Sequence, residues 1–310
     1  MEEKKITIGG QAVIEGVMMR GPELVATAVR NPQGRIEMEV KPVNSIADRY
    51  PIFKKPMLRG CVSLFESLVM GIRSLGYSAQ MAGEEDEQLT DKELAGTMIF
   101  AFALAAVLFI AIPTGAAKLF HFITEDPVFL NLMEGVLRLL IFMAYIFAIS
   151  RMKDIQRVFQ YHGAEHKTIA CFEAGEPLTV ENVTRHTRLH KRCGTSFLLI
   201  VMLVSIFVFA FLGWPDLLER IASRIILLPV VAGISYELIR FSANSDNCLL
   251  GWAVMPGLWL QKLTTREPEP EMIEVAIESA KAVLPEDKIP AGTGSYMQDA
   301  LIADGQGEEI

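Results

Sequence analysis

Four long apolar stretches restrict what this chain can fold into. They are about Gly96–Leu119, Val128–Ser150, Ser196–Trp214 and Ile221–Phe241. A helix needs about 20 apolar residues to cross a bilayer. With 51% hydrophobic residues among 310 and a mean hydropathy of +0.32, the chain is too apolar for an ordinary soluble domain. A large buried helical core is the alternative, but we expect a polytopic membrane protein with about four transmembrane helices.

The distribution of lysine and arginine predicts how these spans are oriented. The loop Phe120–Pro127 contains none, whereas Arg151–Thr195 contains eight. Because basic loops stay on the cytosolic side, we expect Arg151–Thr195 and both termini to be cytosolic, in a multi-pass protein of the inner (plasma) membrane. The first residues, MEEKK, have no apolar segment, so no cleaved signal peptide is expected. The four cysteines are widely spaced, which fits a reducing compartment.

The first part of the chain is predicted to be soluble and rich in strands. We expect residues 1–56 to form a small β-rich cytosolic region, because apolar runs and alternating patterns are separated by turn residues. The expected strands are Gln11–Met19, Leu24–Val29 and Ile36–Val40. Asn31–Gly34 is the expected turn between the last two strands.

Soluble and interfacial segments also flank the apolar stretches. Met57–Gln80 is amphipathic and can lie on the membrane surface, and Asp246–Leu263 is a second interfacial segment. The last residues, 267–310, hold 11 acidic and 2 basic residues, so the net charge of −8 comes from this tail and not from a substrate site. Within the tail we expect a helix at Glu271–Val283 and disorder after Pro285.

These features divide the chain into six segments. The predicted segments are the β-rich region (1–56), the amphipathic helix and acidic linker (57–93), transmembrane helices 1 and 2 (94–150), the cytosolic histidine-rich loop (151–195), transmembrane helices 3 and 4 with an interfacial segment (196–266), and the acidic, partly disordered tail (267–310). The expected fold class is therefore an α-helical polytopic membrane protein with a small N-terminal β-rich cytosolic region and amphipathic interfacial helices.

The residues that point to chemistry lie in the cytosolic loop. It holds four of the five histidines, in the pairs His162/His166 and His186/His190, followed by Cys193. Residues four apart share one face of a helix, so each pair can offer two imidazoles to one ion. Imidazole and thiolate are ligands that zinc favours. We predict that these five residues bind zinc or another divalent transition metal; the alternative is that the histidines only form hydrogen bonds with lipid headgroups or carboxylates.

Glu165 is the predicted catalytic base. In the order H-x-x-E-H it lies beside the second histidine, as in inverted zincins, and a carboxylate there can take a proton from metal-bound water. On a continuous helix, however, Glu165 points about 100° away from His166. One ion can serve both histidine pairs only if the chain bends, and Gly163 is the expected position. The second pair is expected on a helix with Thr179 as its N-cap.

Charged residues inside or near the spans have two interpretations. Glu134 and Arg138 lie four apart, and a mutual ion pair is favoured over a transport path. Glu237 is a further candidate ligand near the cytosolic end of the last span. Glu15 and Arg20 lie among glycines that either permit tight turns or line the cytosolic site.

Several long motifs resemble a known family. They are GGQAVIEGVMMRGP at 9–22, YHGAEHKT at 161–168, RCGTSF at 192–197 and PGLWLQ at 256–261. Together they are similar to the DUF1385 family over about residues 6–268. That family is a bacterial membrane group that is sometimes labelled a predicted metal-dependent enzyme. The resemblance therefore implies the histidine site but no particular reaction.

Two functions follow from these observations. The first is a metal-dependent integral membrane enzyme, hydrolytic, with its site at the cytosolic membrane face. The second is a non-catalytic scaffold or accessory factor for translocation, insertion or quality control of membrane proteins. A transporter is a weaker third, because no span is broken into half-helices. The expected partners are the lipid bilayer and other membrane proteins, and no nucleic acid.

Overall fold

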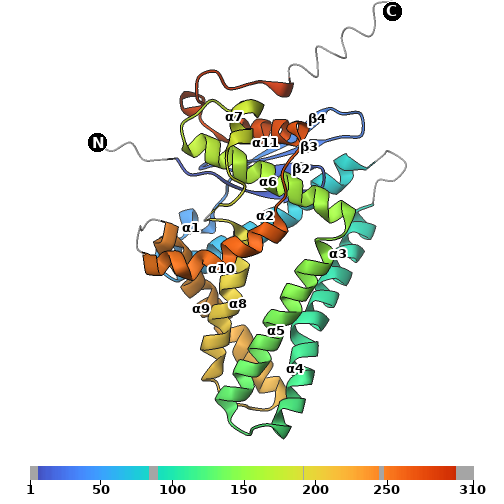
Figure 1. Cartoon of the computed structure of the whole chain (residues 1–310). Coiled ribbons are helices and arrows are strands. Elements are labelled where there is room, and N and C mark those ends of the chain that lie inside the picture. The colour runs from blue at the N-terminus through green and yellow to red at the C-terminus, as the bar shows by residue number, and fades with distance from the viewer. Residues whose placement is uncertain (1–5, 84–89, 191, 244–247, 298–310) are drawn as a thin grey trace, which may run out of the picture.

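Figure 1 shows the computed structural model of the chain, which describes residues 6–83, 90–190, 192–243 and 248–297. A small sheet covered by helices lies at one end of the molecule, and long helices extend away from it. The N-terminal strands and the last long helix lie together at the sheet end. The fold is mostly helical with a small N-terminal sheet, as the sequence predicts.

The sheet is antiparallel, and its strands follow one another in the order β1-β2-β3-β4. The strands are β1 (Gly9–Val13), β2 (Gly16–Arg20), β3 (Leu24–Arg30) and β4 (Ile36–Pro42). The turn predicted at Asn31–Gly34 is confirmed: the Gly34 N–H donates to the Asn31 carbonyl at 2.9 Å. Gly34 has a φ of +83°, a conformation that glycine adopts without steric cost.

The prediction of one strand over Gln11–Met19 is wrong. The chain reverses at Ile14 and Glu15, so this segment forms the hairpin of β1 and β2. Glu15 has a φ of 49°, which is uncommon for a residue other than glycine. Its carboxylate accepts two hydrogen bonds from Arg157, at 2.6 and 2.5 Å. A contact with a distant residue thus supports the turn, which local sequence patterns do not reveal.

Helices cover both faces of the sheet. Helices α6 (Lys153–Glu173) and α11 (Pro270–Val283) pack on one face, and α2 (Leu58–Ala82) packs on the other. The core of this region lies between the sheet and helices α6 and α11, where Val17 and Ile277 are fully buried. On the opposite face the Thr27 hydroxyl donates to the Ser74 hydroxyl of α2 at 2.9 Å. The predicted amphipathic helix at Met57–Gln80 is therefore present, with one side against the sheet.

Helix α11, near the C-terminal end of the described residues, belongs to this core. The sequence places residues 267–310 in an acidic tail, yet α11 contributes buried residues such as Met272 and Ala276. The helix expected at Glu271–Val283 is confirmed as α11. The expected disorder after Pro285 is wrong for residues 286–297: the Gly294 N–H donates to the Leu178 carbonyl at 3.0 Å. Glu271 is exposed and Glu274 is half-buried on the outer side of this amphipathic helix, whereas Glu278 is buried, so composition alone hides the apolar face. Residues 298–310 lie outside the described part of the chain.

Two helical runs are long and apolar enough to cross a membrane, by length and composition, in the part of the chain that the structure describes. They are Lys92–Phe122 and Pro127–Ile149. The first run comprises α3 (Asp91–Ala106), η3 (Val107–Ala111), α4 (Ile112–Ala116) and η4 (Ala117–Phe122), and the second is α5 (Pro127–Ile149).

The segments predicted as spans 3 and 4 form α8 (Gly194–Ala210), a shorter apolar helix, and α9 (Leu217–Ala243). Helix α10 (Cys248–Thr264) follows α9. The remaining elements are α1 (Ile46–Arg49), η1 (Pro51–Lys54), α7 (Val180–Arg185) and η5 (Glu286–Lys288).

Buried charges join the apolar helices. The predicted pair forms, with 2.9 Å between the Arg138 guanidinium and the Glu134 carboxylate. A third residue that the sequence analysis did not connect, Arg224 of α9, donates to the same carboxylate at 2.9 Å. Thr114 of α4 donates to it at 3.1 Å. One carboxylate therefore links α4, α5 and α9, which favours a packing role for this group over a transport path.

Candidate metal centre

Helix α6 carries the first histidine pair. It begins after a break at Ser150–Met152 and runs without interruption through His162, Glu165 and His166. The bend expected at Gly163 is therefore absent. A side chain at Gly163 would collide with the Arg266 carbonyl, so this glycine lets the segment after α10 pass close to α6. The close approach of these two segments positions the first histidine of the pair.

His162, His166 and Cys193 come together in a buried cluster. Their potential ligand atoms all lie within 4.8 Å of one another. The His162 Nε2 is 3.2 Å from the Cys193 sulfur. Cys193 precedes α8 as its N-cap residue, so it reaches the cluster from another part of the chain. The cluster, hereafter the His162–His166–Cys193 cluster, contains three of the five predicted ligands.

Backbone carbonyls orient both imidazoles. The His162 Nδ1 donates to the Thr264 carbonyl at 2.8 Å, and the His166 Nδ1 donates to the Arg188 carbonyl at 2.6 Å. In metal sites, hydrogen bonds of this kind fix the ring and leave the other nitrogen free to bind the ion. The His166 Nε2 is buried and has no hydrogen-bond partner among the described residues. That atom is therefore available as a ligand.

Charge separation stabilises the cluster in the absence of an ion. Burial disfavours the imidazolium of His162, but the neighbouring Cys193 sulfur outweighs this and raises the histidine pKa to about 9. Burial likewise disfavours the thiolate, yet His162 and His166 lower the pKa of Cys193 well below its usual range. A thiolate is the form of cysteine that binds metals. The neighbouring histidines thus favour the form of the sulfur that can act as a ligand.

Glu165 lies next to the cluster without belonging to it. Its side chain is buried, with 4% exposure, and its Oε2 has no hydrogen-bond partner among the described residues. This oxygen lies 4.0 Å from the His162 Nε2, one helical turn away. Burial raises the pKa of the carboxyl above its usual range, against the opposing influence of the nearby histidines. The helical angle that separates Glu165 from His166 therefore does not remove it from the site.

The second histidine pair is split. Helix α7 begins after Thr179, whose hydroxyl accepts from the Asn182 N–H as predicted, but it ends at Arg185. His186 follows in an extended conformation, so His186 and His190 do not share a helix face. The His186 Nε2 lies 3.3 Å from Glu176, in a separate group with Cys171. His186 is therefore not part of the His162–His166–Cys193 cluster.

His190 borders the cluster. Its ring centroid is 5.7 Å from that of His166, and its Nε2 is 3.5 Å from a Glu173 oxygen. Gln261 of α10 holds the His190 backbone, accepting from its N–H at 2.8 Å and donating to its carbonyl at 2.7 Å. Sequence reasoning gave no role to Gln261 or to the Thr264 carbonyl. Only one feature of the sequence pointed to them: Gln261 is the last residue of the motif PGLWLQ.

A cavity of about 680 Å³ opens beside the cluster. Its walls come from α6, from the β1 edge, from Ser63 and Ser67 of α2, and from the start of α8. Such a volume is within the range of about 300–1,000 Å³ that is usual for ligand sites. Both Glu165 and the cluster residues line this cavity. A molecule in the cavity would therefore contact Glu165 and the candidate ligands together.

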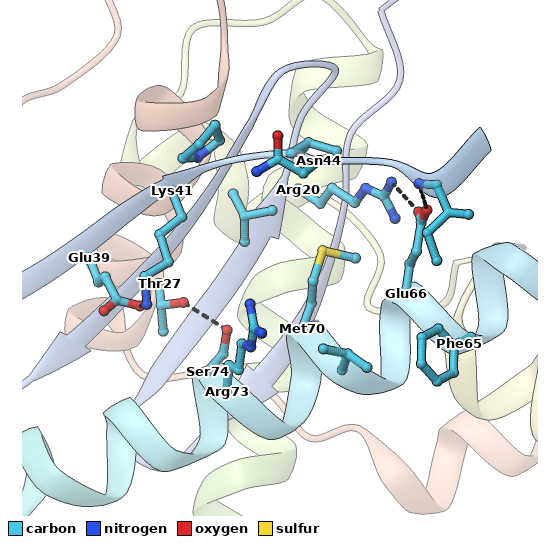
Figure 2. Close-up of a pocket in the computed structure, with 15 residues that line it drawn as sticks. Arg20, Thr27, Glu39, Lys41, Asn44, Phe65, Glu66, Met70, Arg73 and Ser74 are labelled. Atoms are coloured by element: carbon cyan, nitrogen blue, oxygen red, sulfur yellow. Dashed lines mark hydrogen bonds and ion pairs between the residues drawn. The ribbon is translucent and has the colours of Figure 1, made fainter. Parts of the chain in front are cut away.

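A second cavity of about 350 Å³ lies between the sheet and α2, and Figure 2 shows its lining. Arg20 and Met70 line both cavities. Arg20 donates to Glu66 at 3.1 Å, and Glu66 also accepts from the Ile46 N–H at 2.8 Å. None of the lining residues is a histidine or cysteine. The second cavity therefore adds no candidate ligands to the centre.

Two other candidates have structural partners. Glu15 receives hydrogen bonds from Arg157 and, at 3.3 Å, from the Tyr161 hydroxyl. Glu237 accepts from the Arg59 Nε at 2.8 Å and from the Met57 N–H at 3.3 Å. These contacts explain both residues without a ligand role, because each carboxylate already pairs with an arginine.

Residues 55–286 match a family model described as "Protein of unknown function (DUF1385)". The chain belongs to the DUF1385 family. It is also similar to the protein named "Uncharacterized protein YqhQ" of Bacillus subtilis (strain 168), with 37% identity over 294 residues, which is 89% of this chain and 92% of the relative. No solved structure matches the chain. The family model covers the complete His162–His166–Cys193 cluster.

The cluster predicts a specific dependence of stability on pH. The raised pKa of His162 and the lowered pKa of Cys193 favour a protonated imidazole and an ionised thiol in the metal-free fold. The unfolded chain binds one proton more than the fold below about pH 6.5, where its histidine is protonated and its thiol is neutral. From about pH 6.5 to about 9, both states bind equal numbers of protons. The stability contributed by this pair should therefore decrease as the pH falls below about 6.5.

Thermal unfolding of the chelator-treated, detergent-solubilised protein measures this effect between pH 5 and 9. Cys193→Ser should reduce the acid dependence, because it removes the ionised sulfur. Cys171→Ser is the matched control, since burial raises the pKa of the Cys171 thiol to about 11 and keeps it neutral over this range. Identical pH profiles for wild type and Cys193→Ser would contradict the ion pair.

Proposed function

We propose that this protein is a metal-dependent integral membrane enzyme that catalyses hydrolysis at the cytosolic face of the membrane. The observation that carries the proposal is the convergence, on the wall of one cavity, of three buried candidate ligands and a buried carboxylate whose Oε2 has no hydrogen-bond partner among the described residues. Catalytic zinc sites have three protein ligands and one open position. The His162–His166–Cys193 cluster supplies a donor set of that kind.

Zinc is the proposed ion, because its preferred ligands include both imidazole and thiolate. Bound zinc lowers the pKa of a water ligand to about 7, which supplies a nucleophile at neutral pH. His166 would contribute the Nε2 that has no other partner, and Cys193 its thiolate. His190 is the nearest further imidazole, and Glu173 lies within 3.5 Å of its Nε2.

Glu165 is the proposed general base. Its Oε2 lies 4.0 Å from the His162 Nε2 and has no hydrogen-bond partner among the described residues. A base works best when its pKa is close to the working pH, and burial moves the carboxyl in that direction. Glu165 would take a proton from the attacking water and deliver it to the leaving group. Its separation from the ligand group supports a catalytic role over ligation.

For the membrane part, we propose four spans with both termini in the cytosol. The two long apolar runs would form the first pair, and α8 with α9 the second. Support comes from the uneven lysine and arginine content of the loops and from the contact of α9 with α5 through Glu134. This topology puts the His162–His166–Cys193 cluster on the cytosolic side.

Reporter fusions test the topology. A reporter fused after Glu125 should behave as extracytoplasmic, and one fused after Thr179 as intracellular. The reason is the lack of basic residues in the first loop and the eight in Arg151–Thr195. The reverse pattern would move the cluster to the other compartment.

Elemental analysis of the purified protein tests the metal. Wild type, prepared without chelators, should carry close to one zinc per chain. His166→Ala and Cys193→Ala should each remove most of it, because each deletes a ligand from a buried site. His186→Ala is the matched control and should keep the metal, since His186 pairs with Glu176 outside the cluster. Folded wild type without metal would refute the centre.

Glu165→Gln tests the role of the base. It retains the size of the side chain, so fold and zinc content should stay as in wild type. Activity of the protein in cells should be lost, with a decrease of at least about a hundredfold, as expected for removal of a general base. Glu181→Gln, at an exposed position, is the control. If Glu165→Gln retained full function, the scaffold role would be the better explanation.

A further inference from the structure

We infer that the substrate of this site is an extended segment of polypeptide that pairs with the free edge of β1. The inference rests on the proposed hydrolytic function and names its substrate class. Extended peptides bind many proteins by adding a strand to an open sheet edge, where backbone hydrogen bonds give affinity. Three features of the described residues support such a mode here: an open edge, its distance from the base, and the charges of the cavity.

The first feature is the open edge. β1 pairs with β2 on one side, and no strand of the described residues pairs with its other side. Gly9, Gly10 and Gln11 are exposed. In an antiparallel ladder, alternate residues direct their N–H and C=O groups away from the partner strand. An edge of this kind is a template for another chain.

The second feature is proximity to the base. The β1 residues line the same cavity as Glu165 and the His162–His166–Cys193 cluster. A Cβ atom added at Gly10 would lie 3.0 Å from the Glu165 Cγ. The strand therefore runs directly beside the carboxylate, and no side chain separates the two. A peptide paired with this edge would bring its own carbonyl groups to the cluster.

The third feature concerns charge. The arginines that line the cavity are both engaged, Arg20 with Glu66 and Arg192 with Glu173. No lysine is among the lining residues that the structure describes. A phosphate-bearing lipid headgroup needs uncommitted cations, whereas a peptide backbone needs hydrogen-bond donors and acceptors. The lining therefore favours a polypeptide over a phospholipid.

The reaction is the hydrolysis of a peptide bond. The water oxygen attacks the carbonyl carbon and forms the new C–O bond, while Glu165 takes one proton from that water. The C–N bond then breaks, and Glu165 gives the proton to the leaving nitrogen. The products are a carboxylic acid and an amine, with no change of oxidation state.

Gly9→Phe tests the edge. No atom lies within 4 Å of a Cβ built at Gly9, so the fold should accept the change, while the ring would occupy the cavity beside β1. Gly96→Phe is the matched control, at an exposed glycine of α3 with equal space. The probe is fluorescently labelled casein, an unfolded polypeptide, with full-length zinc-loaded protein in detergent. Wild type and Gly96→Phe should cleave casein, and Gly9→Phe should lose at least about tenfold in kcat/KM, equivalent to one or two backbone hydrogen bonds.

Hydrogen exchange gives a second readout that does not depend on turnover. Excess casein should protect those alternate amides of Gly9–Ala12 that point away from β2 in the Glu165→Gln protein, which cannot cleave it. Unchanged exchange there, or equal casein cleavage by Gly9→Phe and wild type, would overturn the inference. Hydrolysis of phosphatidylglycerol vesicles without casein cleavage would also overturn it, yet would leave the proposed hydrolase intact. A zinc-free wild type would instead refute the proposed function itself.

Discussion

Two hydrogen bonds from imidazole Nδ1 atoms to backbone carbonyls determine the geometry of the candidate centre. Thr264 and Arg188 supply these carbonyls, and each binds one histidine of α6. Because these hydrogen bonds hold the Nδ1 atoms of both rings, the two Nε2 atoms point toward each other and toward the Cys193 sulfur. Moving the end of α10 or the loop after α7 would therefore change the site without altering any ligand. The centre depends on its supporting backbone as much as on its three side chains.

The order of elements along the chain explains how that support arises. The sheet forms from the first residues, but its covering helix α11 comes from near the end of the described chain. The Ser279 hydroxyl of α11 donates to the Ala26 carbonyl of β3 at 3.0 Å. The helices that run away from the sheet lie between these two parts in sequence (Figure 1). Docking of α11 against the sheet therefore closes the sheet region around the two ends of the segment that carries the apolar helices, and it brings the segment after α10 alongside α6.

The apolar helices have an anchor of their own. Glu134 is fully buried and accepts from Arg138, Arg224 and Thr114. A buried carboxylate is costly without partners, and the two arginines and the threonine supply them. This arrangement constrains how α9 meets α5, and α9 in turn contacts α2 through Glu237 and Arg59. The position of α2, which forms one wall of the larger cavity, is thus coupled to the packing of the apolar helices.

The sequence by itself determined the features that depend on neighbouring residues. Helical spacing placed His162 and His166 on one face, the turn residues located Asn31–Gly34, and Thr179 was recognised as a cap. Only the tertiary structure decided that Cys193 joins the first pair and that His186 does not. It also put Glu165 beside the cluster and the β1 edge beside Glu165. His162 and Thr264 are 102 residues apart. Periodicity and capping act over a few residues, whereas contacts at such separations depend on how whole helices and strands pack.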